Sequence, residues 1–155
     1  MSKERLVELL SSDEPDYLEA AKASEGQIPT LIDIVKTGGE SLAPRAIYMA
    51  GLIESENITE VLQLGASSPS PVVRIATAAT IGNMDRLQSG DKIAKLIGTL
   101  LKDSDVGVRK MALFSISDID LRTDTIRSGI EHLAQHDELD EMRRFASELS
   151  DKIIK

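Results

Sequence analysis

The chain has 155 residues, of which 41% are apolar, and its formal net charge at pH 7 is −8. This apolar content suffices for a single folded domain over residues 1–155 with a real core, and it excludes an intrinsically disordered chain. The sequence contains no cysteine, which excludes a disulfide framework, a thiolate zinc site and a cysteine nucleophile.

Apolar residues recur at the three- and four-residue spacing of amphipathic helices from the first residues onward. No segment alternates with the two-residue period of a strand, and no Asn-Gly or Asp-Gly hairpin turn occurs. The sequence therefore predicts an all-α protein. The apolar stripes are Leu6, Leu9 and Leu10, then Ile28, Leu31, Ile32 and Val35, then Ile93, Leu96, Ile97, Leu100 and Leu101, then Ile126, Ile130 and Leu133.

Gly, Pro, Ser and Asp interrupt the helical pattern at regular intervals along the chain. These residue types end one helix or cap the next. The breaks predict about ten short helices that pair as five antiparallel hairpins. Strong breaks lie at 11–15, 37–39, 67–71, 102–105 and 136–137, and weaker ones at 25–26, 55–57, 88–90 and 120–121.

The predicted second helices of these hairpins begin alike. In each, an arginine follows a capping region, and the arginines Arg45, Arg74, Arg109 and, more loosely, Arg143 are spaced 29, 35 and 34 residues apart. Self-similarity at such a period is the signature of a repeat array. We therefore expect an α-α superhelix in which neighbouring hairpins stack around one continuous core.

The segment 68–74, Ser-Pro-Ser-Pro-Val-Val-Arg, followed by Ile81-Gly82, resembles the short HEAT repeats of the phycobilisome-lyase type. The segment 102–112 is the second-best match, and the first hairpin departs from the pattern by carrying Glu19 at the arginine position. The resemblance implies a HEAT-like solenoid whose second helices line the concave side. It also implies that aspartates in the turns pair with the arginines and tie one repeat to the next.

We interpret the repeated arginines as an intramolecular ladder rather than as a basic surface for an acidic partner. Asp103 and Asp105 are the expected direct partners of Arg109. Ser41 and Ser70 replace Asp in two other repeats, where we expect them to act only as hydrogen-bonding caps. The predicted ladder consists of Arg45, Arg74, Asp103, Asp105, Arg109 and Arg143.

Positions one, five and nine after each arginine share one face of a helix. Ile75 and Phe114 would anchor a shallow groove there that could accept a partner helix or an extended peptide. The alternative is that these side chains pack against neighbouring helices. The stripe comprises Ala46, Ala50 and Glu54, then Ile75, Ala79 and Asn83, then Lys110, Phe114 and Asp118, then Arg144, Glu148 and Lys152. The candidate binding residues are Ile75, Asn83, Lys110, Phe114, Asp118 and Arg144.

His132 and His136 lie one helical turn apart, a spacing that suits metal ligands. The zinc-protease pattern requires Glu directly after the first His, where this chain has Leu133. Iron-binding HEAT-fold enzymes such as deoxyhypusine hydroxylase use repeated His-Glu pairs, whereas Glu131-His132 occurs once and in reverse order. We therefore expect no metal site, no cofactor and no catalytic residue.

The sequence has no phosphate-binding loop, dinucleotide fingerprint or nucleophile elbow. We predict a non-catalytic protein–protein interaction module, an adaptor, scaffold or regulator, that binds a partner segment on the concave face. We expect it to be cytoplasmic, to bind no membrane, and to be a monomer or weak homo-oligomer. The alternative is an accessory enzyme or cofactor-handling protein of the HEAT-like lyase or hydroxylase type. Nucleic-acid binding is a weaker alternative, through Arg86, Lys92, Lys95, Lys102 and Lys110.

Overall fold

The computed structural model describes residues 2–23, 27–84, 90–118 and 123–154, and these ranges contain helices but no strand. The all-α prediction is therefore confirmed. Ten helices follow one another along the described chain: α1 (Lys3–Ser11), α2 (Tyr17–Ala23), α3 (Ile28–Thr37), α4 (Gly39–Ala50), α5 (Ile58–Ala66), α6 (Pro71–Gly82), α7 (Asp91–Leu100), α8 (Val106–Asp118), α9 (Asp124–His136) and α10 (Asp140–Ile154).

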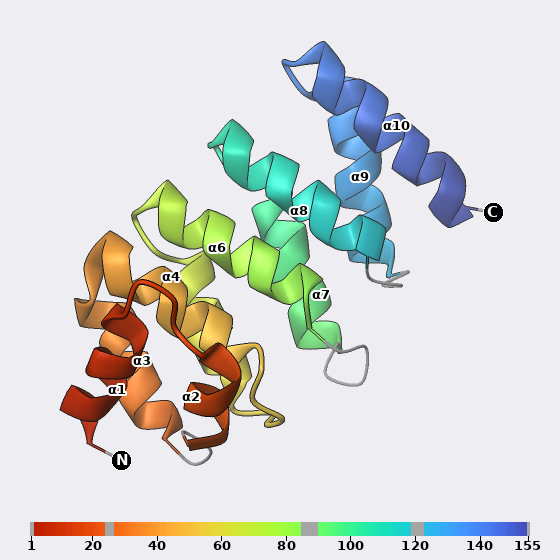
Figure 1. Cartoon of the computed structure of the whole chain (residues 1–155). Helices are drawn as coiled ribbons and strands as arrows, with labels where there is room; N and C mark the ends of the chain where they lie inside the picture. Colours follow the sequence, from red (N-terminus) through yellow and green to blue (C-terminus); the bar gives the residue numbers. More distant parts are fainter. Residues whose placement is uncertain (1, 24–26, 85–89, 119–122, 155) are drawn as a thin grey trace.

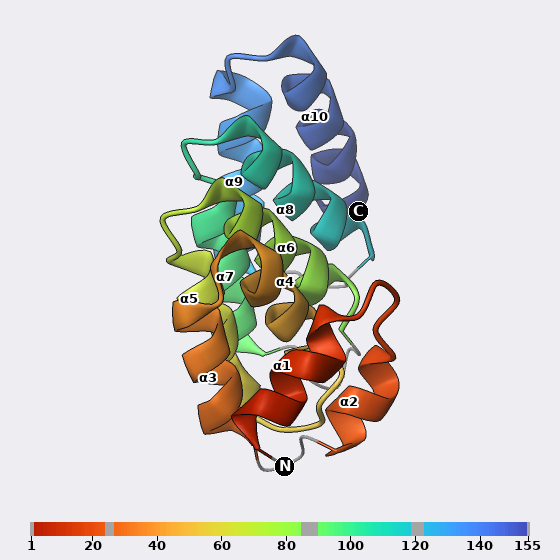
Figure 2. The ribbon, with the colours of Figure 1, turned by 60° about the vertical axis from the view of Figure 1, so that its left-hand side comes forward.

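The helices pack as successive hairpins in two layers, as an α-α superhelix requires (Figure 1). One layer holds the first helices α3, α5, α7 and α9, and the other holds the second helices α4, α6, α8 and α10. Figure 2 shows the two layers side by side, with α1 and α2 closing the N-terminal end against α4. We call the exposed side of α4, α6, α8 and α10 the second-helix face.

Local sequence explains where several helices begin. The Ser2 side chain accepts a hydrogen bond from the Arg5 backbone N–H at the start of α1, and the Thr123 side chain does the same for Ile126 in α9. Pro71 opens α6, where its missing N–H costs little. These caps fix the short turns that join the two helices of a hairpin or two successive hairpins.

Buried apolar side chains form one cluster from Leu6 in α1 to Leu149 in α10. Each hairpin contributes residues to it, so no hairpin buries its apolar face alone. Full burial of one such leucine or isoleucine stabilises the fold by about 1.5–3 kcal/mol. Among the described helices, none is long and apolar enough to cross a membrane.

Two glycines set the close approach of neighbouring second helices. A Cβ added at Gly51 would lie 2.5 Å from Cγ2 of Thr80, and one added at Gly82 would lie 3.0 Å from Cα of Ser115. Gly51 and Gly82 therefore occupy equivalent places, and they are 31 residues apart. The predicted alignment of Arg45 with Arg74, which are 29 residues apart, is wrong by two residues.

Candidate interaction surface

Arg74 ties the hairpin α5–α6 to the next hairpin. Its Nε donates to Oδ2 of Asp103 at 2.8 Å, and its Nη2 donates to Oδ1 of the same carboxylate at 3.1 Å. Its Nη1 also donates to the carbonyl oxygen of Ser68 at 2.8 Å, in the turn of its own hairpin. One guanidinium thus joins two consecutive turns, and both charged partners are largely buried.

Arg109 repeats this arrangement one hairpin further along. Its Nε donates to Oδ2 of Asp137 at 2.9 Å, and its Nη1 donates to the carbonyl oxygens of Asp103 and Ser104 at 3.0 and 3.2 Å. The side chains of Arg109 and Asp137 are only 9% and 1% exposed. The ion pair therefore lies inside the interface between the hairpins α7–α8 and α9–α10.

The structure corrects the predicted partners of Arg109. Asp103 pairs with Arg74 instead, and Asp105 caps α8 by accepting a hydrogen bond from the Val108 N–H at 3.1 Å. Asp137 is the residue that sequence reasoning missed. It follows Asp103 by 34 residues, the same spacing that separates Arg143 from Arg109, and this spacing was the signal that could have found it.

Arg45 points backward along the array, not forward. Its Nη1 donates to the carbonyl oxygens of Leu10 and Ser12, at 2.6 and 2.7 Å, in the first hairpin. The 31-residue register explains this difference, because the place equivalent to Arg74 in α4 is held by Ala43.

The other predicted ladder positions also differ from expectation. Arg143 pairs with Asp140 of its own helix and donates to the carbonyl oxygen of Asp137. Ser70 makes no cap and donates instead to Oε1 of Glu40 at 2.6 Å. Ser41 lies inside α4 rather than before it. The four arginines are thus engaged within the fold, so they offer no ladder of free cations to a partner.

The middle of the second-helix face is apolar. Tyr48 on α4, Val72 on α6 and Phe114 on α8 are 39%, 48% and 45% exposed. Between Pro71 and Met84 the only charged residue is Arg74, whose guanidinium is held by Asp103. We call the exposed and half-buried apolar residues of this region the apolar band: Tyr48, Val72, Ile75, Ala76, Ala79, Met111 and Phe114.

Two residues predicted for this stripe do not reach the surface. Ala46 and Ala50 are fully buried, because they were placed with the register that the glycine contacts overturn. In the 31-residue register, Tyr48 is the α4 residue that corresponds to Ala79. Ile75 is half-buried as part of the band, and Asn83 is exposed at the end of α6. The side chain of Asp118 lies outside the described residues.

A hollow of about 340 Å³ continues the band between α8 and α10. The rings of Phe114 and Phe145 meet at its wall with centroids 5.0 Å apart. Lys110 Nζ lies 3.3 Å from Oε1 of Glu141 across the hollow. The lining residues are Lys110, Phe114, Glu141, Met142, Arg144, Phe145 and Glu148. The candidates Lys110, Phe114 and Arg144 therefore meet at one place.

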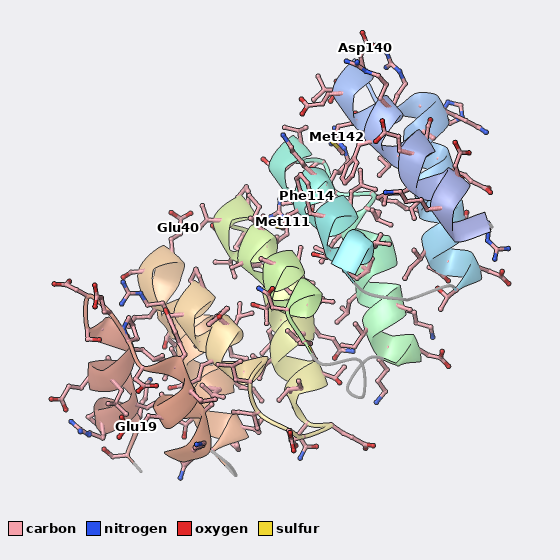
Figure 3. The ribbon with its side chains drawn as sticks, turned by 45° about the vertical axis from the view of Figure 1, so that its right-hand side comes forward. Glu19, Glu40, Met111, Phe114, Asp140 and Met142 are labelled. Carbon is pink, nitrogen blue, oxygen red and sulfur yellow. The ribbon has the colours of Figure 1, made fainter. Side chains whose placement is uncertain are left out.

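Charge around the apolar band is uneven. Figure 3 shows Glu19 and Glu40 at the α2–α4 end of the second-helix face, with Met111 and Phe114 further along it. Four exposed carboxylates, those of Asp13, Glu14, Asp16 and Glu19, fall within seven residues at this end. At the hollow, two cations face two carboxylates, so that end is neutral.

The two histidines lie away from the band. They line a second hollow, of about 490 Å³, with Lys102, Arg109 and Asp137 among its other residues. The imidazole centroids of His132 and His136 are 5.0 Å apart. In the described ranges, no three His, Asp or Glu side chains group closely enough to hold a metal ion. The pair thus presents two candidate ligands and no described third.

The predicted nucleic-acid residues do not form one patch. Lys92 and Lys95 are exposed on α7, in the layer of first helices, and Lys102 follows that helix. Lys110 lies on α8 in the other layer and pairs with Glu141. Arg86 lies outside the described residues.

No protein-family model matches the sequence, and none of the curated proteins matches it. The function is therefore argued from the site itself.

Proposed function

We propose that the protein is a non-catalytic interaction module of the HEAT-like class that binds a segment of another protein on the second-helix face. The observation that carries this proposal is the apolar band. Of the six large apolar side chains that are exposed in the described chain, Tyr48, Val72 and Phe114 belong to it. Contiguous exposed apolar surface of this kind is typical of protein-binding sites.

The assignment to a HEAT-like class is supported by the contacts between hairpins. Arg74 with Asp103, and Arg109 with Asp137, are the type of arginine–aspartate pair between successive repeats that the sequence resemblance implies. These pairs hold neighbouring second helices side by side. A partner would then meet a face whose shape is fixed before it binds, which reduces the entropy lost on binding.

The size of the band sets the expected affinity. Full burial of a large apolar side chain contributes about 1.5–3 kcal/mol, and Tyr48, Val72 and Phe114 each have roughly half of their surface left to bury. Together they would contribute a few kcal/mol before the costs of association. We therefore expect binding in the micromolar range, at about −8 kcal/mol, when a partner adds polar contacts.

The test is to select peptides from a random displayed library on the wild-type protein and then to measure their affinity for variants. Ile75→Asp and Phe114→Asp place a carboxylate in the band, and Leu139→Asp makes the same change at an exposed leucine in the α9–α10 turn. We expect the two band variants to weaken binding at least about tenfold and the Leu139 control to leave it unchanged. Circular dichroism would verify that each variant is folded.

Two outcomes would reject the proposal. One is that no peptide is selected; the other is that selected peptides bind the folded band variants as tightly as the wild type. An accessory enzyme of the lyase or hydroxylase type stays the alternative prediction. Stoichiometric metal or a visible chromophore in protein purified from its source would support that alternative.

A further inference from the structure

We propose that the segment bound by this face is an amphipathic helix of about 14 residues that carries lysine or arginine at one end and a bulky apolar residue at the other. This inference rests on the proposed function. The basic end would lie over the α2–α4 end of the second-helix face, and the apolar end would enter the hollow between α8 and α10.

The length follows from the width of the apolar band. The band crosses three neighbouring second helices, from Tyr48 on α4 to Phe114 on α8. Packed helices lie about 9–10 Å apart, so the band is roughly 20 Å wide. A helix rises 1.5 Å per residue, and about 14 residues would cross that distance.

A helix suits this face better than an extended peptide does. The face is built from α4, α6 and α8, whose backbone N–H and C=O groups are engaged within the helices, and it offers no strand edge. An extended peptide would therefore bury its own backbone polar groups against apolar side chains without partners. A bound helix pairs those groups internally and presents a ridge of side chains.

The relief of the band accommodates such a ridge. Ala79 of α6 lies between Tyr48 of α4 and Phe114 of α8 at equivalent places of three consecutive helices. Two large aromatic side chains thus flank a floor of alanines, Ala76 and Ala79. We expect a leucine-sized side chain in the middle of the bound helix to rest on this floor.

The polarity follows from the charges at the two ends. At the α2–α4 end, Tyr17 of α2 packs edge-on against Tyr48, with ring centroids 4.8 Å apart, which joins α2 to the band. Asp16 and Glu19 flank Tyr17 in the sequence, and Asp13 and Glu14 precede it. Lys22 is the one base in α2, so this end is acidic and favours cationic groups.

The opposite end selects an apolar group instead. In the hollow, Lys110 pairs with Glu141, and Arg144 and Glu148 also balance in charge. Met142, Phe114 and Phe145 supply an apolar wall. A charged side chain entering this hollow would lose hydration and meet no net opposite charge, whereas an apolar side chain would gain by burial.

The experiment measures binding of fluorescent peptides to the full chain by anisotropy. Three synthetic helices of about 14 residues share one leucine-rich side with a phenylalanine in the first turn. They carry three lysines, three glutamines or three glutamates in the last turn. We expect the lysine peptide to bind at least about tenfold tighter than the glutamate peptide at low salt, and the ratio to shrink at high salt.

A matched pair of protein variants locates the effect. Glu14→Lys/Glu19→Lys reverses two charges at the α2 end, and Glu60→Lys/Glu131→Lys makes the same net change on α5 and α9, in the layer of first helices. We expect the first variant to weaken the lysine peptide about tenfold and the control variant less than about twofold.

The outcomes separate this inference from the proposed function. If the glutamine or glutamate peptide binds as tightly as the lysine peptide and Phe114→Asp abolishes that binding, the interaction surface stands and the basic end is wrong. If both charge variants weaken binding equally, only the net charge of the chain acts, and the inference is overturned. If none of the three helices binds, the inference also fails, and the displayed library alone decides the proposed function.

Discussion

The buried pair of Arg109 and Asp137 should be the strongest single tie between the last two hairpins. Asp137→Ala would leave the guanidinium, 9% exposed, without its charge partner. It would also remove the acceptor that Oδ1 offers to the Leu139 N–H at 3.0 Å. Removing one partner of a buried ion pair costs about 3–5 kcal/mol. The same loss at the surface pair of Arg5 and Glu8, 57% and 70% exposed, costs about 0–1 kcal/mol.

Equilibrium unfolding in urea would measure these differences. We expect Asp137→Ala to lower the free energy of unfolding by about 3–5 kcal/mol. Asp137→Asn, which keeps an acceptor but removes the charge, should lower it by about 1.5–3 kcal/mol. The surface control Arg5→Ala should change it by less than about 1 kcal/mol.

The position of the loss is a second readout. In an array where each hairpin contacts only its neighbours, weakening one interface loosens the elements on its terminal side. Hydrogen exchange should therefore accelerate most in α9 and α10 of Asp137→Ala. A loss below about 1 kcal/mol, or uniform acceleration from α3 to α10, would refute the argument that this pair couples the two hairpins.

Three further predictions follow from the fold and the hollows. Gly82→Ala would place a Cβ 3.0 Å from a backbone atom of α8 and should destabilise the protein by about 1–3 kcal/mol. Gly107→Ala meets only side-chain ends and should cost less than about 1 kcal/mol; equal losses in urea unfolding would contradict the close crossing. Arg45→Ala removes two hydrogen bonds to the first hairpin and should cost about 1–3 kcal/mol, with faster proteolysis between α1 and α2. An unchanged cleavage rate would show that α1 and α2 are held by packing alone. Excess zinc should leave the thermal midpoint unchanged, because His132 and His136 have no described third ligand; a rise that His132→Ala abolishes would reveal a site.

The helices and their order could be predicted because the signals are local. Apolar spacing identifies a helix, and breaks such as Gly38 between α3 and α4 mark its ends. Stacking into a superhelix follows from hairpins that cannot bury their apolar faces alone. The ladder partners could not be predicted equally well, since pairing Arg109 with Asp137 spans 28 residues and depends on how two hairpins dock.

The register of α4 shows most directly where sequence similarity misleads. Arg45 resembles Arg74 in its sequence setting, yet the two residues lie at different places of their hairpins. Inter-helix contacts, not the arginines, fix the equivalence, because Gly51 and Gly82 are the places where the next second helix comes closest. The misplaced register hid Tyr48, an exposed aromatic residue of the band, and pointed to buried alanines instead.

Stability and binding occupy different places along the second helices, and this separation makes both testable. The arginine of each central hairpin reaches the turn at the start of its helix, where Arg74 meets Asp103 and Arg109 meets Asp137. Those contacts use the repeated charges within the fold, so the face beyond them keeps an apolar surface around Ala79. Ladder variants should therefore lower stability while the folded fraction keeps its peptide affinity. Variants at Phe114 should do the reverse, because its side chain is 45% exposed and contributes little to the core.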